Sequence, residues 1–170
     1  MTRTRIYLAS PLGFAESTRA FMDELVKDLS AHVDVLNPWD DKGFAAEFQE
    51  LDEQNDRHVR NRRLHEINMK IGRANCASID AADAVFGVLD GVDVDSGTAA
   101  EMGYAFAKGK FVSGIRTDFR LAGDNDGSIV NLQVQYFIEG SGGRLVRTAK
   151  DLVELASEYS ADHTQKQVAD

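Results

Sequence analysis

Residues 82–109 constrain the fold of this chain more than any other stretch. They open with an apolar run, 84–89, which has the composition of a strand buried on both faces. An acidic loop with two glycines follows, and residues 98–108 then carry apolar side chains at helical spacing. A strand, a loop and a helix in this order form half of a βαβ unit. Ligands of open α/β sheets bind at the carboxyl ends of strands, so we expect the functional site in this loop.

Strand and helix patterns alternate along the whole chain. Strands are predicted at 5–10, 33–36, 84–89, 110–115 and 145–147, and helices at 14–31, 42–51, 56–81, 98–108 and 149–159. The pattern at 129–138 fits either a strand or a helix face. This alternation predicts an α/β fold: a single flavodoxin-like domain with a five-stranded parallel sheet, in the order 2-1-3-4-5, flanked by helices. The domain is expected to span 1–160, followed by a polar C-terminal tail at 161–170.

Glu101 is the principal candidate for chemistry, because it follows the acidic loop and lies in the first turn of the helix predicted at 98–108. The predicted strand order brings the loop after the first strand next to this loop, so two distant stretches converge on one crevice. The helix N-terminus favours the ionised form of Glu101 by about 0.3–1 kcal/mol, which suits a nucleophile. Asp95 lies just before the helix, and two carboxylates in one cleft tend to differ in pKa, as retaining glycosyl transfer requires. The alternative is that Glu101 and Asp95 only mark a helix start and a loop position.

The charge balance and the apolar pattern exclude several classes of protein. The chain carries 28 acidic and 19 basic residues, and its net charge of −9 argues against a nucleic-acid partner. No apolar run approaches the roughly 18 residues of a transmembrane helix. The N-terminal apolar run is too short for a signal peptide, so we expect no membrane partner and a cytoplasmic protein. The single cysteine, Cys76, excludes an internal disulfide and a cysteine-based zinc site, and it is expected in the core.

Three stretches together resemble the nucleoside 2-deoxyribosyltransferase family. They are IYLASPL at 6–12, the segment 75–103, and NLQ at 131–133. The most specific part is DSGTAAEMGYA, which begins at Asp95 and contains Glu101. The resemblance covers about residues 4–150.

The resemblance implies that Glu101 attacks C1′ of a 2′-deoxynucleoside and expels the base. A deoxyribosyl ester forms, and a second nucleobase or water then takes the sugar. Tyr7 would orient this nucleophile, and Asp95 would contact the sugar hydroxyls or share in proton handling. Asn131 would reach the sugar 5′-hydroxyl in a neighbouring subunit, which implies a homo-oligomer with shared sites. The implied partners are 2′-deoxynucleosides and free nucleobases, with no cofactor and no metal.

Further substrate-binding residues follow from the same resemblance. They are Ser10, Leu12, Phe14, Asn75, Gly97, Thr98, Asn131 and Gln133. Leu12 and Phe14, with Trp39, would pack the base, while plain core packing is the alternative for Phe14 and Trp39. Aromatic stacking combined with a few polar groups predicts that many bases are accepted.

Two positions depart from the family pattern. Asn75 stands where lactobacillal members carry an Asp that hydrogen-bonds and protonates the base. An amide can hydrogen-bond a base but is a poor proton donor, so Asp95 and water become the candidates for the general acid. Gln133 stands where those members carry a Met, so contacts to the base or the sugar are expected to differ there.

Two other functions compete with the transfer of 2-deoxyribose between nucleobases. A 2′-deoxynucleoside 5′-phosphate N-hydrolase would share Glu101 but need a phosphate pocket, and no basic residue stands beside Ser10 or Asn131. A non-catalytic nucleotide-binding module is the other alternative, since a fold does not fix a function. The transferase would consume a free nucleoside, whereas the N-hydrolase would consume a 5′-monophosphate. Ligand binding and a biological effect that survive Glu101→Ala would indicate the binding module.

Overall fold

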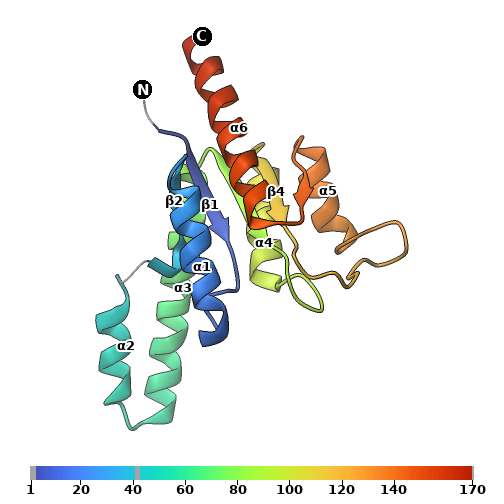
Figure 1. Cartoon of the computed structure of the whole chain (residues 1–170). Coiled ribbons are helices and arrows are strands. Elements are labelled where there is room, and N and C mark those ends of the chain that lie inside the picture. The colour runs from blue at the N-terminus through green and yellow to red at the C-terminus, as the bar shows by residue number, and fades with distance from the viewer. Residues whose placement is uncertain (1–2, 41–42, 170) are drawn as a thin grey trace.

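A five-stranded, all-parallel sheet forms the centre of the computed structural model, which describes residues 3–40 and 43–169 (Figure 1). The strands are β1 (Arg5–Ala9), β2 (Asp34–Leu36), β3 (Ala84–Val88), β4 (Phe111–Ile115) and β5 (Leu145–Val146). Their order is β2-β1-β3-β4-β5, which confirms the predicted fold class and strand order. The strand order reverses between β1 and β3, so the switch point lies between these two strands.

Helices cover both faces of the sheet (Figure 1). They are α1 (Glu16–Leu29), α2 (Ala45–Asp52), α3 (Arg57–Ala81), α4 (Ser96–Ala107), α5 (Leu132–Gly140) and α6 (Ala149–Ala169), together with a short 3-10 helix, η1 (Pro38–Asp40). Buried residues of α1 and α6 pack on one face, and those of α3, α4 and α5 pack on the other. Right-handed crossovers produce this distribution, because the chain reverses its direction across the sheet after β2. None of the described helices is both long and apolar enough to cross a membrane.

The two-residue period of β1 decides which layer each of its side chains enters. Ile6 and Leu8 point into the layer of α1 and α6, whereas Tyr7 and Ala9 face α3, α4 and α5. All residues of β3 are buried, as expected of a strand that is covered on both faces. Tyr7 is fully buried, so its hydroxyl needs a hydrogen-bond partner within the protein.

The hairpin of α2 and α3 projects beyond the edge of the sheet (Figure 1). Asp56 caps the N-terminus of α3, where its side chain accepts hydrogen bonds from two backbone N–H groups. Along its whole length α3 buries only Ile67 and Ile79, so its contact with the rest of the protein is narrow. Cys76 is therefore exposed, and the prediction that it belongs to the core was wrong.

The ambiguous range 129–138 contains a helix, α5, and not a strand. Asn131 caps this helix, since its Oδ1 accepts a hydrogen bond from the backbone N–H of Gln133 at 3.0 Å. The helix predicted at 42–51 corresponds to α2, although its predicted first residue lies outside the described residues.

The last helix, α6, continues to Ala169, so the predicted end at Tyr159 was wrong. The ring of Tyr159 stacks on that of Phe111 in β4, with the centroids 4.7 Å apart. This contact anchors the helix to the sheet at the predicted end, and an anchored helix extends readily through polar residues. The division into a domain at 1–160 and a tail at 161–170 remains a prediction.

Candidate active site

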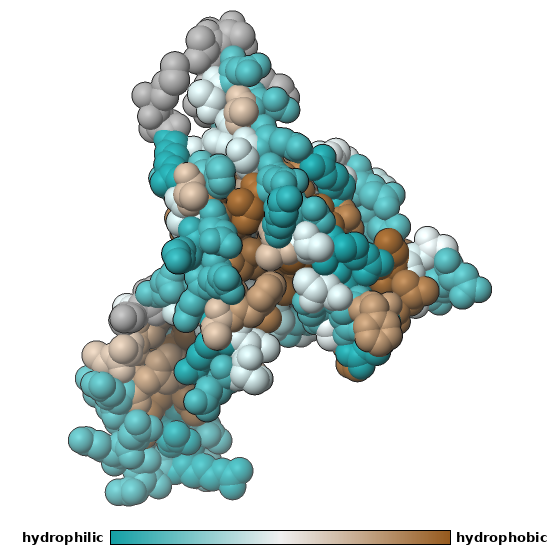
Figure 2. All heavy atoms as spheres, viewed as in Figure 1, coloured by the Kyte–Doolittle hydropathy of each residue, from teal (hydrophilic) through white to brown (hydrophobic). Residues whose placement is uncertain are grey.

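A cavity of about 770 Å³ lies at the carboxyl end of β1, beside η1, the hairpin of α2 and α3, and the start of α4. Its polar wall includes Ser10, Asn68, Asn75, Asp95, Ser96, Thr98 and Glu101. Its apolar wall includes Phe14, Pro38, Trp39, Phe44, Ala45, Phe48 and Ile71. Figure 2 shows hydrophobic residues gathered on the lobe formed by α2 and α3, within a hydrophilic surface. Apolar surface with a few convergent polar groups is the usual form of a small-molecule site.

Glu101 is held by hydrogen bonds from two other elements. The hydroxyl of Tyr7, in β1, donates to Oε1 of Glu101 at 2.8 Å. The side-chain amide of Asn75, in α3, donates to the same oxygen at 3.1 Å. The structure thus brings together three candidates that lie far apart in the sequence, and it places Tyr7 in direct contact with the proposed nucleophile.

Burial raises the pKa of the Glu101 carboxyl above its usual value, and the charge of Asp95 adds to this increase. The hydrogen bonds from Tyr7 and Asn75 act in the opposite direction, but burial is the largest effect. The prediction that Glu101 lies in the first turn of its helix was wrong. α4 begins at Ser96, so Glu101 lies in the second turn, where the helix dipole acts weakly. Burial, and then the charge of Glu101, also raises the pKa of Tyr7, so its hydroxyl remains a donor.

Asp95 is the N-cap residue of α4 and also lines the cavity. Its Oδ2 accepts a hydrogen bond from the backbone N–H of Thr98 at 2.9 Å and another from the Thr98 hydroxyl at 3.2 Å. Gly97 and Thr98 line the cavity as well, as the sequence predicts. A simple helix start accounts for the cap formed by Asp95. It does not account for the two donors on Glu101 inside the cavity.

Phe14 and Trp39 form the aromatic end of the cavity. Their rings meet edge to face with the centroids 4.6 Å apart. The indole N–H of Trp39 donates to the backbone carbonyl of Ser10 at 2.7 Å, which fixes the plane of the indole. Phe14 is 76% exposed, so core packing does not explain its position. The pair offers aromatic surface on which a planar ligand can stack.

Three residues predicted to bind substrate do not line this cavity. Leu12 is buried in the core on the side of α1. Its backbone N–H donates to Oγ of Ser10 at 3.0 Å, and the turn that this hydrogen bond closes directs the chain toward the core. Asn131 caps α5, and Gln133 is exposed in the first turn of that helix. A role for Asn131 in the site of a neighbouring subunit remains a prediction.

Sequence reasoning did not name seven residues of the cavity as site residues: Pro38, Phe44, Ala45, Phe48, Asn68, Ile71 and Ser96. Asn68, Ile71 and Asn75 follow one another at intervals of three and four positions, so they share one face of α3. This spacing is visible in the sequence. Only the fold shows that this face meets the end of β1.

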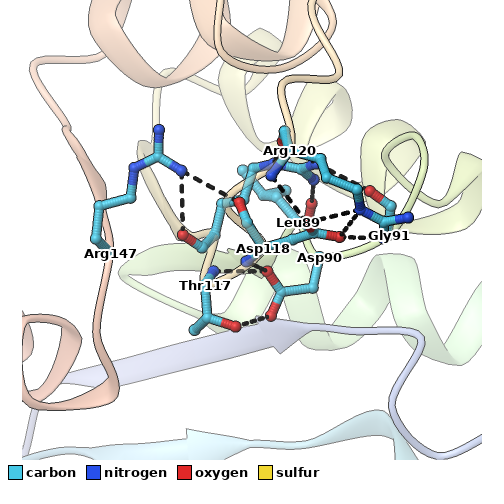
Figure 3. Close-up of polar contacts among 8 residues, drawn as sticks. Leu89, Asp90, Gly91, Thr117, Asp118, Arg120 and Arg147 are labelled. Carbon is cyan, nitrogen blue, oxygen red and sulfur yellow. Dashed lines mark hydrogen bonds and ion pairs between the residues drawn. The ribbon is translucent and has the colours of Figure 1, made fainter.

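The loop between β3 and α4 is fixed by polar contacts with the chain that follows β4 (Figure 3). The carboxylate of Asp90 accepts hydrogen bonds from the backbone N–H of Thr117 at 2.6 Å and from its hydroxyl at 2.7 Å (Figure 3). The fully buried guanidinium of Arg116 donates to the carbonyls of Leu89 and Gly91. These contacts hold the acidic loop in one conformation and so fix the direction in which α4 starts.

The family model described as nucleoside 2-deoxyribosyltransferase matches residues 6–133. No curated protein matches the sequence. Among solved structures, a conserved protein from Enterococcus faecalis V583 is 24% identical with a TM-score of 0.66, and the match covers 93% of this chain and 99% of that protein. A 2-deoxyribosyltransferase from Bacillus psychrosaccharolyticus is 23% identical with a TM-score of 0.56, over 88% and 90% of the two chains. A CMP N-glycosidase from Clostridium botulinum is 16% identical with a TM-score of 0.54, over 92% and 99%. These three structures share the fold of the chain.

Proposed function

Because the chain belongs to the nucleoside 2-deoxyribosyltransferase family, we propose that it transfers 2-deoxyribose between nucleobases through a covalent ester on Glu101. The observation that carries this proposal is the position of Glu101, which lines the cavity and is held at Oε1 by Tyr7 and Asn75. A carboxylate oriented in this way, in a cavity that also has aromatic walls, is suited to attack a sugar whose base stacks on those walls.

In the first half-reaction, a carboxylate oxygen of Glu101 bonds to C1′ of a bound 2′-deoxynucleoside. The bond between C1′ and the base nitrogen breaks, and its electron pair leaves with the base, which takes up one proton from Asp95 or from water, the two candidates for the general acid. A 2-deoxy sugar lacks the hydroxyl that would destabilise an oxocarbenium-like transition state, so the catalytic help needed is modest. The products are a free base and a deoxyribosyl ester.

In the second half-reaction, a ring nitrogen of another base attacks C1′ on the face that the first base left. The ester bond between C1′ and oxygen breaks, its electron pair returns to Glu101 as a carboxylate, and the attacking base loses one proton. Two displacements retain the configuration at C1′. Water in place of the second base gives hydrolysis as a side activity, and base exchange itself serves nucleotide salvage.

The charge of the cavity supports a neutral nucleoside as substrate over a 5′-phosphate. Asp95 and Glu101 are both acidic, and no Lys, Arg or His lines the cavity within the described part of the chain. A phosphate would favour the N-terminus of α4, but the carboxylate of Asp95 already occupies that position as the cap. Both observations favour the transferase over the 5′-phosphate N-hydrolase.

A chromatographic assay with 2′-deoxyinosine and free adenine tests this proposal. We expect 2′-deoxyadenosine and hypoxanthine to form with the wild type and neither to form with Glu101→Gln, which preserves the shape of the side chain. Hypoxanthine without a new nucleoside would indicate a hydrolase. The assay is repeated with a 2′-deoxynucleoside 5′-monophosphate. If only this monophosphate is consumed, the result indicates the N-hydrolase. If none of the substrates reacts, the result supports the binding module.

We propose further that the protein acts as a homo-oligomer in which a neighbouring subunit supplies Asn131 to each site. Exposed apolar side chains lie in α5 and in the loop before it, on either side of Asn131 in the sequence: Phe119, Leu121, Leu132 and Tyr136. Figure 2 shows hydrophobic residues at the surface in this part of the molecule. Clustered apolar surface of this kind is typical of subunit contacts.

A further inference from the structure

Asn75 makes a contact that a role in binding the base does not explain. Its side-chain amide donates to Oε1 of Glu101 at 3.1 Å. Tyr7 donates to the same oxygen at 2.8 Å from a different element. Two donors, one from β1 and one from α3, therefore converge on one carboxylate oxygen and restrict the orientation of the carboxylate plane.

The second oxygen of Glu101, Oε2, accepts no hydrogen bond from the residues that the structure describes. It is not enclosed by protein, because no buried side-chain N or O atom within the described ranges lacks a hydrogen-bond partner. Since Glu101 lines the cavity, Oε2 is the oxygen that a ligand in the cavity can reach.

On the basis of the proposed function, we propose that Asn75 is a positioning residue, which together with Tyr7 holds Oε1 and leaves Oε2 as the atom that attacks C1′. The new bond forms between Oε2 and C1′, while the bond from C1′ to the base nitrogen breaks and the base leaves with the electron pair and takes up a proton. Oε1 becomes the carbonyl oxygen of the ester and keeps both donors. When the second base displaces the ester, these donors stabilise the negative charge that returns to the carboxylate.

An amide at position 75 donates to Oε1 without adding a charge beside it. An Asp there would place a second negative charge beside Oε1, and one of the two carboxyls would then have to hold a proton. The other titratable groups around Glu101 are Tyr7 on β1 and Asp95 at the start of α4, with Cys76 on α3 close enough to act on Tyr7. The departure of Asn75 from the family pattern thus provides a neutral donor for the nucleophile.

Asn75→Asp and a matched control, Asn68→Asp, test this role. Both changes add a carboxylate to the same face of α3 inside the cavity, but only position 75 contacts Glu101. We expect Asn75→Asp to move the acidic limb of the pH profile of kcat upward by about one pH unit or more, and Asn68→Asp to move it far less. Asn75→Ala is expected to lower kcat by about 10- to 100-fold for every base offered, with little change in KM.

The opposite pattern would overturn the role of Asn75. In that pattern, the acidic limb of the pH profile does not move in Asn75→Asp. Asn75→Ala then changes only KM, by a factor that differs between bases, as expected of a contact to the base. Equal shifts in both Asp variants would overturn it as well. Titration of the Glu101 carboxyl by carbon-13 NMR reads the same contact without activity. The absence of base exchange in the wild type overturns the proposed function, whereas an unmoved Glu101 titration in Asn75→Asp overturns the role of Asn75.

Discussion

Two opposing requirements meet at Glu101. Burial in the cavity raises the pKa of its carboxyl, whereas attack on a sugar needs the carboxylate. The donors Tyr7 and Asn75 reduce the effect of burial but do not remove it. Charging this group in the folded protein is therefore unfavourable, as is common where function and stability compete at one residue.

Glu101→Gln is expected to abolish transfer and to stabilise the protein. Because the folded-state pKa is raised, the folded state binds this proton more tightly than the unfolded state, which adds stability at low pH. That stability is lost as the pH rises through the folded-state pKa, so the Tm of the variant should increasingly exceed that of the wild type. At neutral pH we expect a stabilisation of about 1 kcal/mol, measured by thermal denaturation across a pH series. A wild type as stable as the variant at neutral pH would contradict this interpretation.

If Asp95 is the general acid, Asp95→Asn is expected to lower kcat by about 100-fold or more, because asparagine cannot supply the proton to the leaving base. Asparagine caps helices as well as aspartate does, so the hydrogen bond to Thr98 and the start of α4 are retained. The Tm should therefore change little, which separates a catalytic loss from a structural one. Steady-state kinetics and thermal denaturation of the same preparation measure both. Full activity in the variant would assign the proton to water.

At the scale of the elements, hydrophobic periodicity decided what could be predicted from the sequence. The continuous apolar run of β3 identified a strand buried on both faces. Residues 129–138 stayed ambiguous because the two-residue and helical periods overlap there, and the cap formed by Asn131 is the signal that favours a helix. The end of α6 could not be predicted from polarity, because the stacking of Tyr159 on Phe111 is a tertiary contact.

The residues of the site also differed in whether they could be located from the sequence. Glu101 could be located from the sequence, because the strand and helix patterns place its loop at the switch point, and Tyr7 was named from the family resemblance. Phe44 and Phe48 could not, since their place in the cavity depends on how the hairpin of α2 and α3 docks. The raised pKa of the Glu101 carboxyl could not be predicted for a related reason, because its largest cause is burial by other elements of the fold.

Gly13→Ala is predicted to disrupt the aromatic wall. A Cβ atom at Gly13 would lie 2.0 Å from Cδ2 of Trp39, so the indole would have to move and lose its hydrogen bond to Ser10. Trp39 is the only tryptophan of the chain, so its fluorescence emission reports the displacement directly. We expect a shifted emission spectrum and a KM for the nucleoside about tenfold higher.

Gly72→Ala is the matched control for this change. A Cβ atom at Gly72 meets nothing within 4 Å, and alanine is favoured over glycine inside a helix such as α3. The control should leave the emission and KM unchanged and add about 0.5–1 kcal/mol of stability. Identical emission spectra for wild type and Gly13→Ala would contradict the contact between Gly13 and the indole.

At the scale of the whole molecule, the proposed homo-oligomer rests on the exposed apolar side chains around α5 and would bring Asn131, which lies outside the cavity of its own subunit, to the site of a second one. A mixing experiment tests this arrangement. Glu101→Ala lacks the nucleophile, and Asn131→Ser keeps a capping side chain for α5 but shortens the group offered to the neighbour. Each variant alone should be nearly inactive. After subunit exchange, about a quarter of the sites in a symmetric oligomer would combine an intact Glu101 with an intact Asn131.

Recovery of activity in the mixture, measured with the base-exchange assay, would support the shared site. A mixture that exchanges subunits but stays inactive would show that Asn131 does not act across a subunit contact. Size-exclusion chromatography with light scattering checks that oligomers form. A monomer with full activity would also contradict the shared site.

The covalent ester on Glu101 is the central claim, and it can be observed directly. The protein is incubated with a 2′-deoxynucleoside without an acceptor base, quenched in acid, digested and analysed by mass spectrometry. We predict that the peptide containing Glu101 gains the mass of one deoxyribosyl group, that free adenine added before the quench removes this adduct, and that Glu101→Gln never forms it. Base exchange in the absence of any adduct, or an adduct on a different residue, would contradict the claim.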